Sequence, residues 1–255
     1  VALAGPEGQL RVMDLEKGSL LYQATYPIFS GGNRASLNHD GTLLGVVLDE
    51  FLPVVISLPD GALISQFYGH RGIVKSIRFD DSSEEVVTAS YDGTARIWNV
   101  ASGELQRELG RHEGSVLDAR FSPDGIHVAT ISIDETARVW NRATGETLFE
   151  VAHEAGLTSC AFSADGKKFA SGSRDGAIHV WDVEAKHAQY VLAGQAGEVT
   201  RLAFSADAGR IVSNSGRGVQ KVWDARQGVL LTSIENLGGG QAVWSARGAT
   251  IVPNI

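Results

Sequence analysis

Short segments of this chain alternate in part between apolar and polar residues, as residues 73–79 and 94–98 do. A period of two is typical of β-strands, and no stretch with a helical period exceeds ten residues. Turn residues recur every 8–12 positions between these segments. Asp-Gly pairs, which supply the left-handed φ that tight hairpins need, begin at Asp92, Asp124, Asp165 and Asp175. The pattern predicts an all-β chain of short antiparallel strands.

A repeat of about 42 residues runs through the chain. Its markers are Trp98, Trp140, Trp181 and Trp223, spaced 42, 41 and 42 residues apart, and a phenylalanine 19 residues before each of them: Phe79, Phe121, Phe162 and Phe204. The same spacing places Ile56 and Met13 at the tryptophan position and Trp244 at the phenylalanine position. Such a period, with strands ending in Trp-Asp or Trp-Asn, is typical of β-propellers, in which the loops between strands carry recognition.

The repeat pattern is Gly-His, a strand to Phe-Ser-x-Asp-Gly, a strand to Ser/Thr-x-x-x-Asp, and a strand to Trp-Asp, and each unit matches part of it. These motifs resemble the WD-repeat (β-transducin repeat) family over essentially the whole chain. The resemblance implies one β-propeller domain over residues 1–255, built from four-stranded antiparallel blades. We expect blades near residues 1–25, 34–68, 73–110, 115–152, 157–193 and 198–234, and a partial one at 241–255. Both ends align with the middle of a blade, so we expect a fragment of a seven-bladed parent, with a closed six-bladed ring as the alternative.

Three blades share a set of polar residues at one spacing. The sets are His70, Thr88, Asp92 and Trp98; His112, Thr130, Asp134 and Trp140; and His153, Ser171, Asp175 and Trp181. A hydroxyl, an imidazole and a carboxylate are also the inventory of a nucleophilic triad. The threefold recurrence favours a structural role, because an enzyme needs one site and a buried indole N–H needs an acceptor. The family resemblance implies hydrogen bonds from Trp to Ser/Thr, from Ser/Thr to His and from His to Asp.

The other blades depart from this set. Blade six keeps Ser213 and Trp223 but has Gln195 and Arg217 in place of the histidine and the aspartate. The equivalent positions are Ile28, Val46, Glu50 and Ile56 in blade two, and Leu3, Glu7 and Met13 in blade one. We therefore expect blades three to five to be stiffer than blades one, two and six.

Composition limits the function classes further. Cys160 is the only cysteine, which excludes an internal disulfide and favours a reducing, cytoplasmic location. The net charge is −8, and residues 1–127 carry 10 basic and 17 acidic side chains, which disfavours nucleic acid as a partner. The sequence shows no apolar run of membrane-spanning length and no set of metal ligands or phosphate-binding loop, so we expect no membrane contact, metal or cofactor. An acidic cluster at Asp80, Asp81, Glu84 and Glu85 is expected to be a solvated loop.

The family resemblance implies that partners bind where the histidine and aspartate loops emerge. At the family's contact positions this chain has the apolar residues Ile73, Tyr91, Leu117 and Ile133, with Lys75 and Arg174 at the rim. An exposed apolar patch with a polar rim is typical of a binding site. The alternative is that some of these side chains tuck into the channel wall.

We therefore expect a non-catalytic module that binds a protein or peptide partner, which could be another domain of the same chain. One alternative is an enzyme with its active site in the central channel. The other is a ubiquitin-ligase adaptor, because Trp223-Asp224-Ala225-Arg226 matches a Trp-Asp-x-Arg pattern that some family members use for docking. No residue is assigned a catalytic role.

Overall fold

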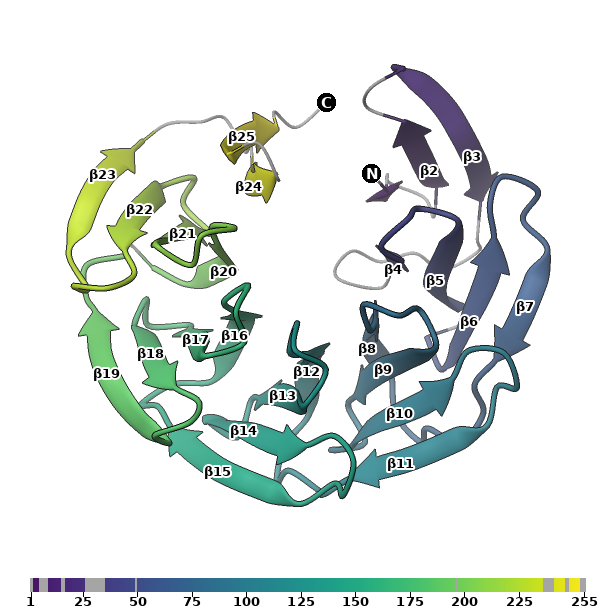
Figure 1. Ribbon diagram of the computed structural model, residues 1–255, viewed down its shortest axis with the longest axis horizontal. Coiled ribbons are helices and arrows are strands. Elements are labelled where there is room, and N and C mark those ends of the chain that lie inside the picture. Colours follow the sequence, from purple (N-terminus) through teal and green to yellow (C-terminus); the bar gives the residue numbers. More distant parts are fainter. Residues whose placement is uncertain are drawn as a thin grey trace. The chain divides into compact units, whose positions relative to one another are not determined.

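The computed structural model describes residues 2–4, 9–14, 17–25, 35–48, 50–195, 197–235, 241–245 and 248–252. The secondary-structure elements within these ranges are all β-strands, β1 to β25 (Figure 1). The predicted all-β fold class is therefore confirmed. Within the described ranges, no helix has the length and apolar character needed to cross a membrane. The predicted network positions Glu7 and Ile28 lie outside the described residues.

The strands pair in chain order into sheets, which we number one to seven. Sheet one is β1–β3 (Ala2–Ala4, Gln9–Asp14, Ser19–Thr25), and sheet two is β4–β7 (Ala35–Leu37, Leu43–Leu48, Leu52–Ser57, Leu63–Gln66). Sheet three is β8–β11 (Val74–Phe79, Glu85–Ser90, Ala95–Asn99, Leu105–Leu109), and sheet four is β12–β15 (Val116–Phe121, His127–Ser132, Thr136–Asn141, Thr147–Ala152). Sheet five is β16–β19 (Leu157–Phe162, Lys168–Ser173, Ile178–Asp182, His187–Leu192), and sheet six is β20–β23 (Val199–Phe204, Arg210–Ser215, Gln220–Asp224, Leu230–Ile234). Sheet seven is β24–β25 (Gln241–Ser245, Gly248–Val252).

Five of these sheets have four strands each within the described ranges, as the resemblance implies. Two compact units divide the chain: unit 1 is residues 1–121 and 140–146, and unit 2 is residues 122–139 and 147–255.

A β-bulge marks the tryptophan position of the repeat. The register between the third and fourth strands shifts at Ile97/Trp98, Val180/Trp181 and Val222/Trp223. The same shift occurs at Val55/Ile56 in sheet two and between the last two strands of sheet one at Val12/Met13. Bulges increase local twist and re-aim the side chains beside them. Ile56 and Met13 therefore occupy the repeat position that the spacing assigned to them, although neither is a tryptophan.

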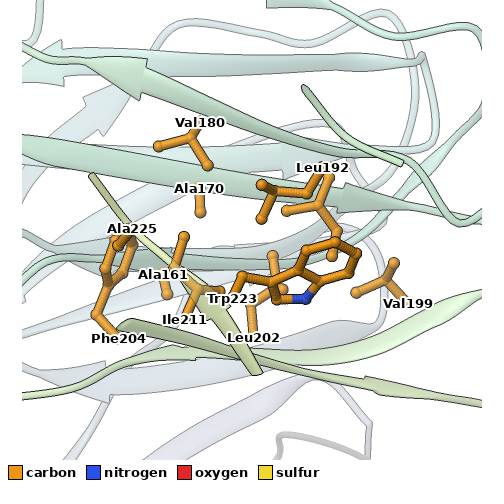
Figure 2. Packing of buried hydrophobic residues seen from close by; sticks show 11 residues of the cluster. Ala161, Ala170, Val180, Leu192, Val199, Leu202, Phe204, Ile211, Trp223 and Ala225 are labelled. Carbon is orange, nitrogen blue, oxygen red and sulfur yellow. The ribbon is translucent and has the colours of Figure 1, made fainter. Parts of the chain in front are cut away.

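Buried apolar side chains form layers between neighbouring sheets of one unit. In unit 1, Phe67 of the segment after sheet two contacts the Trp98 ring of sheet three, with 5.6 Å between ring centroids. In unit 2, the Trp223 indole of sheet six lies among Leu192, Val199 and Leu202 (Figure 2). Each β-sheet buries one face against the next sheet, so the hydrophobic core is a series of layers.

One expectation about unit 1 is wrong. The acidic segment around Asp80 is not wholly a solvated loop, because Asp80 is 4% exposed. Arg142 Nη2 lies 2.7 Å from Asp80 Oδ2, and Arg142 Nε donates to Glu85 Oε2 at 3.0 Å. The guanidinium also lies 4.7 Å from the centre of the Phe121 ring. Asp81 and Glu84 are exposed, as expected for a loop.

Burial alone would raise the pKa of Asp80. Hydrogen bonds from Ser82, from the Glu85 N–H and from Arg142 outweigh it, so the pKa lies below its ordinary value. Asp80 is therefore ionised at neutral pH, and Arg142 neutralises a carboxylate that has little access to water.

Replacing Arg142 should destabilise unit 1 strongly. Arg142→Ala leaves the Asp80 carboxylate buried without its cation, and breaking such a pair costs about 3 kcal/mol. The exposed pair between Arg96 and Glu108 provides the control, because Glu108 is half exposed and Glu108→Ala should cost only about 0–1 kcal/mol. Urea unfolding of both variants measures the difference, and equal losses would contradict the role assigned to Arg142.

Candidate protein-interaction surface

In sheet three a continuous hydrogen-bond chain runs from the buried core to the loop end. Trp98 Nε1 donates to Thr88 Oγ1 at 2.8 Å, and Thr88 Oγ1 lies 2.7 Å from His70 Nε2. His70 Nδ1 lies 2.9 Å from Asp92 Oδ2. Since a carboxylate only accepts, His70 Nδ1 carries a proton and donates to Asp92. The order of contacts is the one that the resemblance implies.

Asp92 also fixes the loops on either side of it. Its Oδ2 accepts the Arg71 N–H at 2.9 Å, and its Oδ1 accepts the Thr94 N–H at 3.0 Å and the Thr94 hydroxyl at 2.7 Å. Burial alone would raise the pKa of Asp92, but the bonds from His70, Thr94 and the Arg71 N–H hold it well below its ordinary value. An ionised Asp92 thus ties the loop after His70 to the turn between β9 and β10.

The polar set of sheet four is divided between the units. In unit 1, the His112 and Trp140 rings meet edge to face at 6.3 Å, close to the 6.0 Å between His70 and Trp98. In unit 2, Asp134 Oδ1 accepts the Thr136 N–H at 3.0 Å and its hydroxyl at 2.7 Å, as Asp92 does with Thr94. Thr130, the fourth member, is fully buried in β13. Each unit therefore holds its part of the set in the geometry of sheet three.

In sheet five the predicted bond between His153 and Asp175 is wrong. Trp181 Nε1 donates to Ser171 Oγ at 3.1 Å, and Ser171 Oγ lies 2.7 Å from His153 Nε2. His153 Nδ1 is nevertheless buried without a hydrogen-bond partner in the part of the chain that is described. Asp175 Oδ1 instead accepts the Ser173 hydroxyl and, at 2.9 Å, the Ala177 N–H.

The His153 ring packs instead on a side chain of β18 that differs from its equivalents in sheets three and four. Sheets three and four pair an arginine with a glutamate across their outer strands, Arg96 with Glu108 at 2.9 Å and Arg138 with Glu150 at 2.6 Å. Sheet five has His179 opposite Val191, which offers no carboxylate. The His179 ring stacks on His153, with 4.0 Å between centroids and 27° between planes.

This environment keeps His153 neutral. Burial, together with the charge that His179 would carry if protonated, lowers the pKa of His153 to about 4, although Asp175 acts in the opposite sense. Burial also lowers the pKa of His179, against the opposing carboxylates of Asp175 and Glu154.

Sheet six completes a shorter chain with different residues. Trp223 Nε1 donates to Ser213 Oγ at 2.8 Å, and Ser213 Oγ donates to Gln195 Oε1 at 3.0 Å. Gln195 Nε2 then donates to the backbone oxygen of Val219 at 3.1 Å. Gln195 therefore satisfies the serine without an aspartate, and Arg217 is exposed. In sheet two the equivalent Val46 and Ile56 are buried, and the relative stiffness of the sheets stays a prediction.

The loop ends repeat one backbone contact, which places the predicted partner-binding positions. The backbone N–H of the residue before the aspartate position donates to the backbone carbonyl of the residue three positions after the histidine. This contact joins Tyr91 to Ile73 at 2.8 Å, Arg174 to Gly156 at 3.1 Å and Gly216 to Glu198 at 3.0 Å. In sheets three, five and six, this bond holds the two loops side by side.

Four of the predicted binding residues lie in unit 1. Tyr91 is 42% exposed, and Ile73, Lys75 and Leu117 are half-buried. Ser115 Oγ, two residues before Leu117, donates to the Tyr91 carbonyl at 3.4 Å, so β12 begins beside the Tyr91 turn. Unit 1 thus gathers Ile73 and Tyr91 at one end of sheet three, next to the start of β12.

The other two predicted residues lie in unit 2. Ile133 is 42% exposed, and Arg174 is exposed. A Cβ added to Gly156 would lie 3.5 Å from the Ile133 carbonyl oxygen, so Ile133 and the Gly156–Arg174 pair are neighbours. Convergence of Ile133 with the residues of unit 1 stays a prediction.

Sequence reasoning missed Asp118, a buried carboxylate of β12. Arg120 Nε lies 2.9 Å from Asp118 Oδ2, and Arg78 Nη2 lies 3.7 Å from Asp118 Oδ1. Burial would raise the pKa of Asp118, and the two arginines together with Ser76 lower it below its ordinary value. An ionised, arginine-paired carboxylate cannot act as a general base without losing its partners. Within the described ranges, no three His, Cys, Asp or Glu side chains are placed to hold a metal ion.

Removing Asp92, the acceptor of the His70 proton in sheet three, should reduce stability more than removing the equivalent Asp175 from sheet five. Asp92→Ala orphans the buried His70 Nδ1 and should lower the free energy of unfolding by about 1–3 kcal/mol. Asp175→Ala is the matched control, because His153 makes no bond to Asp175. Chemical denaturation of both variants decides the point, and a larger loss for Asp175→Ala would contradict the assignment.

His153 should make unit 2 sensitive to acid. Its folded pKa of about 4 lies below the ordinary 6.5, so the unfolded chain binds more protons between these values. Stability is therefore intact above pH 6.5 and falls as the pH drops toward 4, by about 2–3 kcal/mol from this group.

His153→Gln tests this, because glutamine at the equivalent position of sheet six already bonds its serine. The variant should lose less stability than the wild type in urea unfolding between pH 7 and about pH 4.5. His187→Gln, at an exposed histidine of β19, should keep the wild-type pH dependence. Parallel pH curves for the wild type and His153→Gln would rule out His153 as the acid-sensitive group.

Comparison with known proteins places these sheets in a family. The model of the WD domain, G-beta repeat, matches residues 61–99, 103–141 and 145–182. A 30% identical segment occurs in the periodic tryptophan protein 2 homolog of Dictyostelium discoideum and covers 70% of this chain and 15% of that protein. The U5 small nuclear ribonucleoprotein 40 kDa protein of the same organism is 38% identical over 54% of this chain and 42% of its own length.

The U3 small nucleolar RNA-associated protein 21 homolog of Schizosaccharomyces pombe is 29% identical over 40% of this chain and 11% of its own length. The chain thus spans less than half the length of each of these relatives. The matched repeats coincide with the Trp98, Trp140 and Trp181 units, and five of the sheets have the four antiparallel strands of WD-repeat blades. The chain therefore carries WD repeats over residues 61–182.

Proposed function

We propose that the chain is a non-catalytic interaction module, which binds a protein or peptide partner through the loop ends that carry the histidine and aspartate positions. The repeats themselves support a protein-interaction scaffold. The observation that carries the finer proposal is the repeated backbone contact, which presents Tyr91 beside Ile73 on a scaffold held by the Trp98–Asp92 chain. A rigid scaffold with exposed loop residues is the usual arrangement of a recognition site.

The described polar groups favour binding over catalysis. Three groups that could act as an acid or base contact structural partners: Asp92 bonds His70, Asp118 pairs with Arg120, and His153 bonds Ser171. An active site would need a group that is shifted in pKa and also open to a substrate.

Two observations bear on the class of partner: the names of the relatives, and the exposed side chains of the same surface. The names of two relatives refer to a small nucleolar RNA and to a small nuclear ribonucleoprotein, so those proteins belong with assemblies of protein and RNA. Tyr91, Ile73 and Leu117 offer apolar contacts of the kind that protein interfaces use. A partner segment could also come from another part of the same parent chain.

Selection from a library of random displayed peptides tests the proposal. Peptides that bind the wild type should bind Tyr91→Ala about 5- to 30-fold more weakly, because truncating an interface anchor costs about 1–2 kcal/mol. The melting temperature should not change, since Tyr91 is exposed. Leu105→Ala is the control, as Leu105 is 47% exposed at the opposite end of sheet three.

The binding site would lie elsewhere if the selected peptides bound Tyr91→Ala as tightly as the wild type. The same conclusion would follow if Leu105→Ala abolished binding while Tyr91→Ala left it unchanged. A lowered melting temperature with unchanged binding would show that Tyr91 supports the fold instead.

A further inference from the structure

A second aromatic side chain is exposed at the loop end of sheet two. Phe51 lies in the turn between β5 and β6 and is 49% exposed. It follows Glu50, which occupies the aspartate position of this repeat. The offsets that predicted Tyr91 and Ile73 do not include this position. Phe51 is therefore a further apolar side chain at the loop ends of unit 1.

Backbone hydrogen bonds join the turn of Phe51 to the turn of Tyr91. The Val74 N–H donates to the Glu50 carbonyl at 2.7 Å, and the Tyr91 N–H donates to the Ile73 carbonyl at 2.8 Å. The Ile73 carbonyl and the Val74 N–H belong to the same peptide group. In a trans peptide these two groups point in opposite directions. The two turns therefore lie on opposite sides of this peptide group.

The separation of the two turns follows from the same contacts. Backbones joined by hydrogen bonds lie about 4.8 Å apart, so two such steps separate the turns by about 10 Å. Packing of the sheets below them agrees with this value, because Val55 of sheet two and Ile77 of sheet three belong to one buried cluster. Sheets stacked face to face lie about 10 Å apart. Phe51 and Tyr91 are thus presented about one sheet spacing apart, on either side of the half-buried Ile73.

Gly72 fixes the connecting segment against the Tyr91 turn. A Cβ added to Gly72 would lie 2.5 Å from the Asp92 backbone nitrogen and 2.9 Å from the Tyr91 carbonyl carbon. A side chain at this position would therefore push the segment away from the turn. Ser90 Oγ donates to the Gly72 carbonyl at 2.9 Å. Backbone contacts consequently hold the segment between the two aromatic residues in place.

Charge does not select the partner of this surface. The loop segments 50–51, 67–75, 91–94 and 110–115 carry three acidic and three basic side chains. These are Glu50, Asp92 and Glu113, and Arg71, Lys75 and Arg111. The selective features are therefore the apolar side chains and the distance between them.

We propose that the loop ends of sheets two and three bind an extended peptide segment with two prolines three residues apart, one packed on Phe51 and the other on Tyr91. The inference rests on the proposed function and names the class of its partner. A polyproline II segment rises about 3.1 Å per residue, so side chains three residues apart recur on one face about every 9 Å. This repeat matches the separation of the two turns.

Other peptide conformations match the surface less well. Side chains on one face of a β-strand are about 7 Å apart at two residues and about 13 Å apart at four. A helix reaches about 10 Å only between residues seven apart, and its backbone carbonyls are bonded internally. A polyproline II segment leaves its carbonyls open to a donor such as the Tyr91 hydroxyl. Surfaces lined by aromatic side chains recognise such segments, which are ordered before they bind.

Peptides selected on the wild-type protein from a random displayed library supply the test. We expect them to carry two prolines three positions apart. Phe51→Ala should bind them about 5- to 30-fold more weakly, as Tyr91→Ala should, because each variant removes one anchor. Phe51→Tyr keeps the ring and should retain binding. Leu63→Ala is the matched control, since Leu63 is exposed at the opposite end of sheet two, and melting temperatures check that each variant is folded.

Synthetic versions of a selected peptide test the spacing. One alanine inserted between the two prolines should weaken binding to the wild type at least about fivefold, because only one proline can then reach its ring. Replacing both prolines with alanine should weaken binding at least as much. Added salt should change the affinity of the original peptide little, since the charges of the loops balance.

The two proposals fail differently. Two results would overturn the proline-containing partner and leave the interaction surface standing. One is selected peptides that Tyr91→Ala weakens and Phe51→Ala does not. The other is peptides that both variants weaken but whose apolar residues recur at the spacing of a helix or a strand. Binding that neither variant changes would overturn both proposals.

Discussion

The structure depends on one requirement, which is that a tryptophan indole buried between two sheets must find an acceptor for its N–H. Trp98 and Trp223 are 1% and 2% exposed, so water cannot serve them. An unpaired buried donor costs about 1–3 kcal/mol. In both sheets the acceptor is a hydroxyl ten residues earlier, on the neighbouring strand. The indole thus joins the packing of a sheet to the polar groups of its second strand.

Beyond that first acceptor the sheets use different solutions. Sheet three continues through His70 to Asp92, sheet six ends on Gln195 and a backbone carbonyl, and sheet five ends on His153. Ile56 of sheet two needs no acceptor and keeps the bulge. The bulge and the apolar layer are therefore the constant features of the repeat. The groups near the loop end vary, because the fold requires only that the indole and its hydroxyl be satisfied.

The contrast between the constant bulge and apolar layer and the variable groups at the loop end explains what could be predicted from the sequence. The strands, the repeat register at Ile56 and Met13, and the Trp98–Asp92 chain follow from a local period and from the resemblance. The ion pair of Arg142 with Asp80 could not be predicted, because it joins residues 62 apart in different sheets. The His153–His179 stack was missed for a related reason. It joins His153 to His179 of β18, a position that the repeat motif does not include.

The candidate site was only partly predictable for the same physical reason. Tyr91, Ile73 and Lys75 lie at fixed offsets from the histidine and the aspartate, so the repeat alone placed them. Arg71 and Arg111 lie directly beside histidines in the sequence, yet they belong to different repeats. The bond between the His112 N–H and the Gly93 carbonyl brings Arg111 to the turn that Arg71 also contacts.

Charge at a loop end is therefore set by pairs of consecutive repeats. The histidine loop of one repeat closes over the aspartate turn of the repeat before it, as His112 does over Gly93 and His153 over Glu135. The residue beside the histidine changes from Arg111 to Ala152 between these two closures. The turn residue changes from Gly93 to Glu135, which accepts a φ of +70°. The two closures therefore carry different side chains on the same backbone contact. A scaffold of nearly identical repeats can thus present a different charge at each junction without altering the hydrogen bonds that hold it.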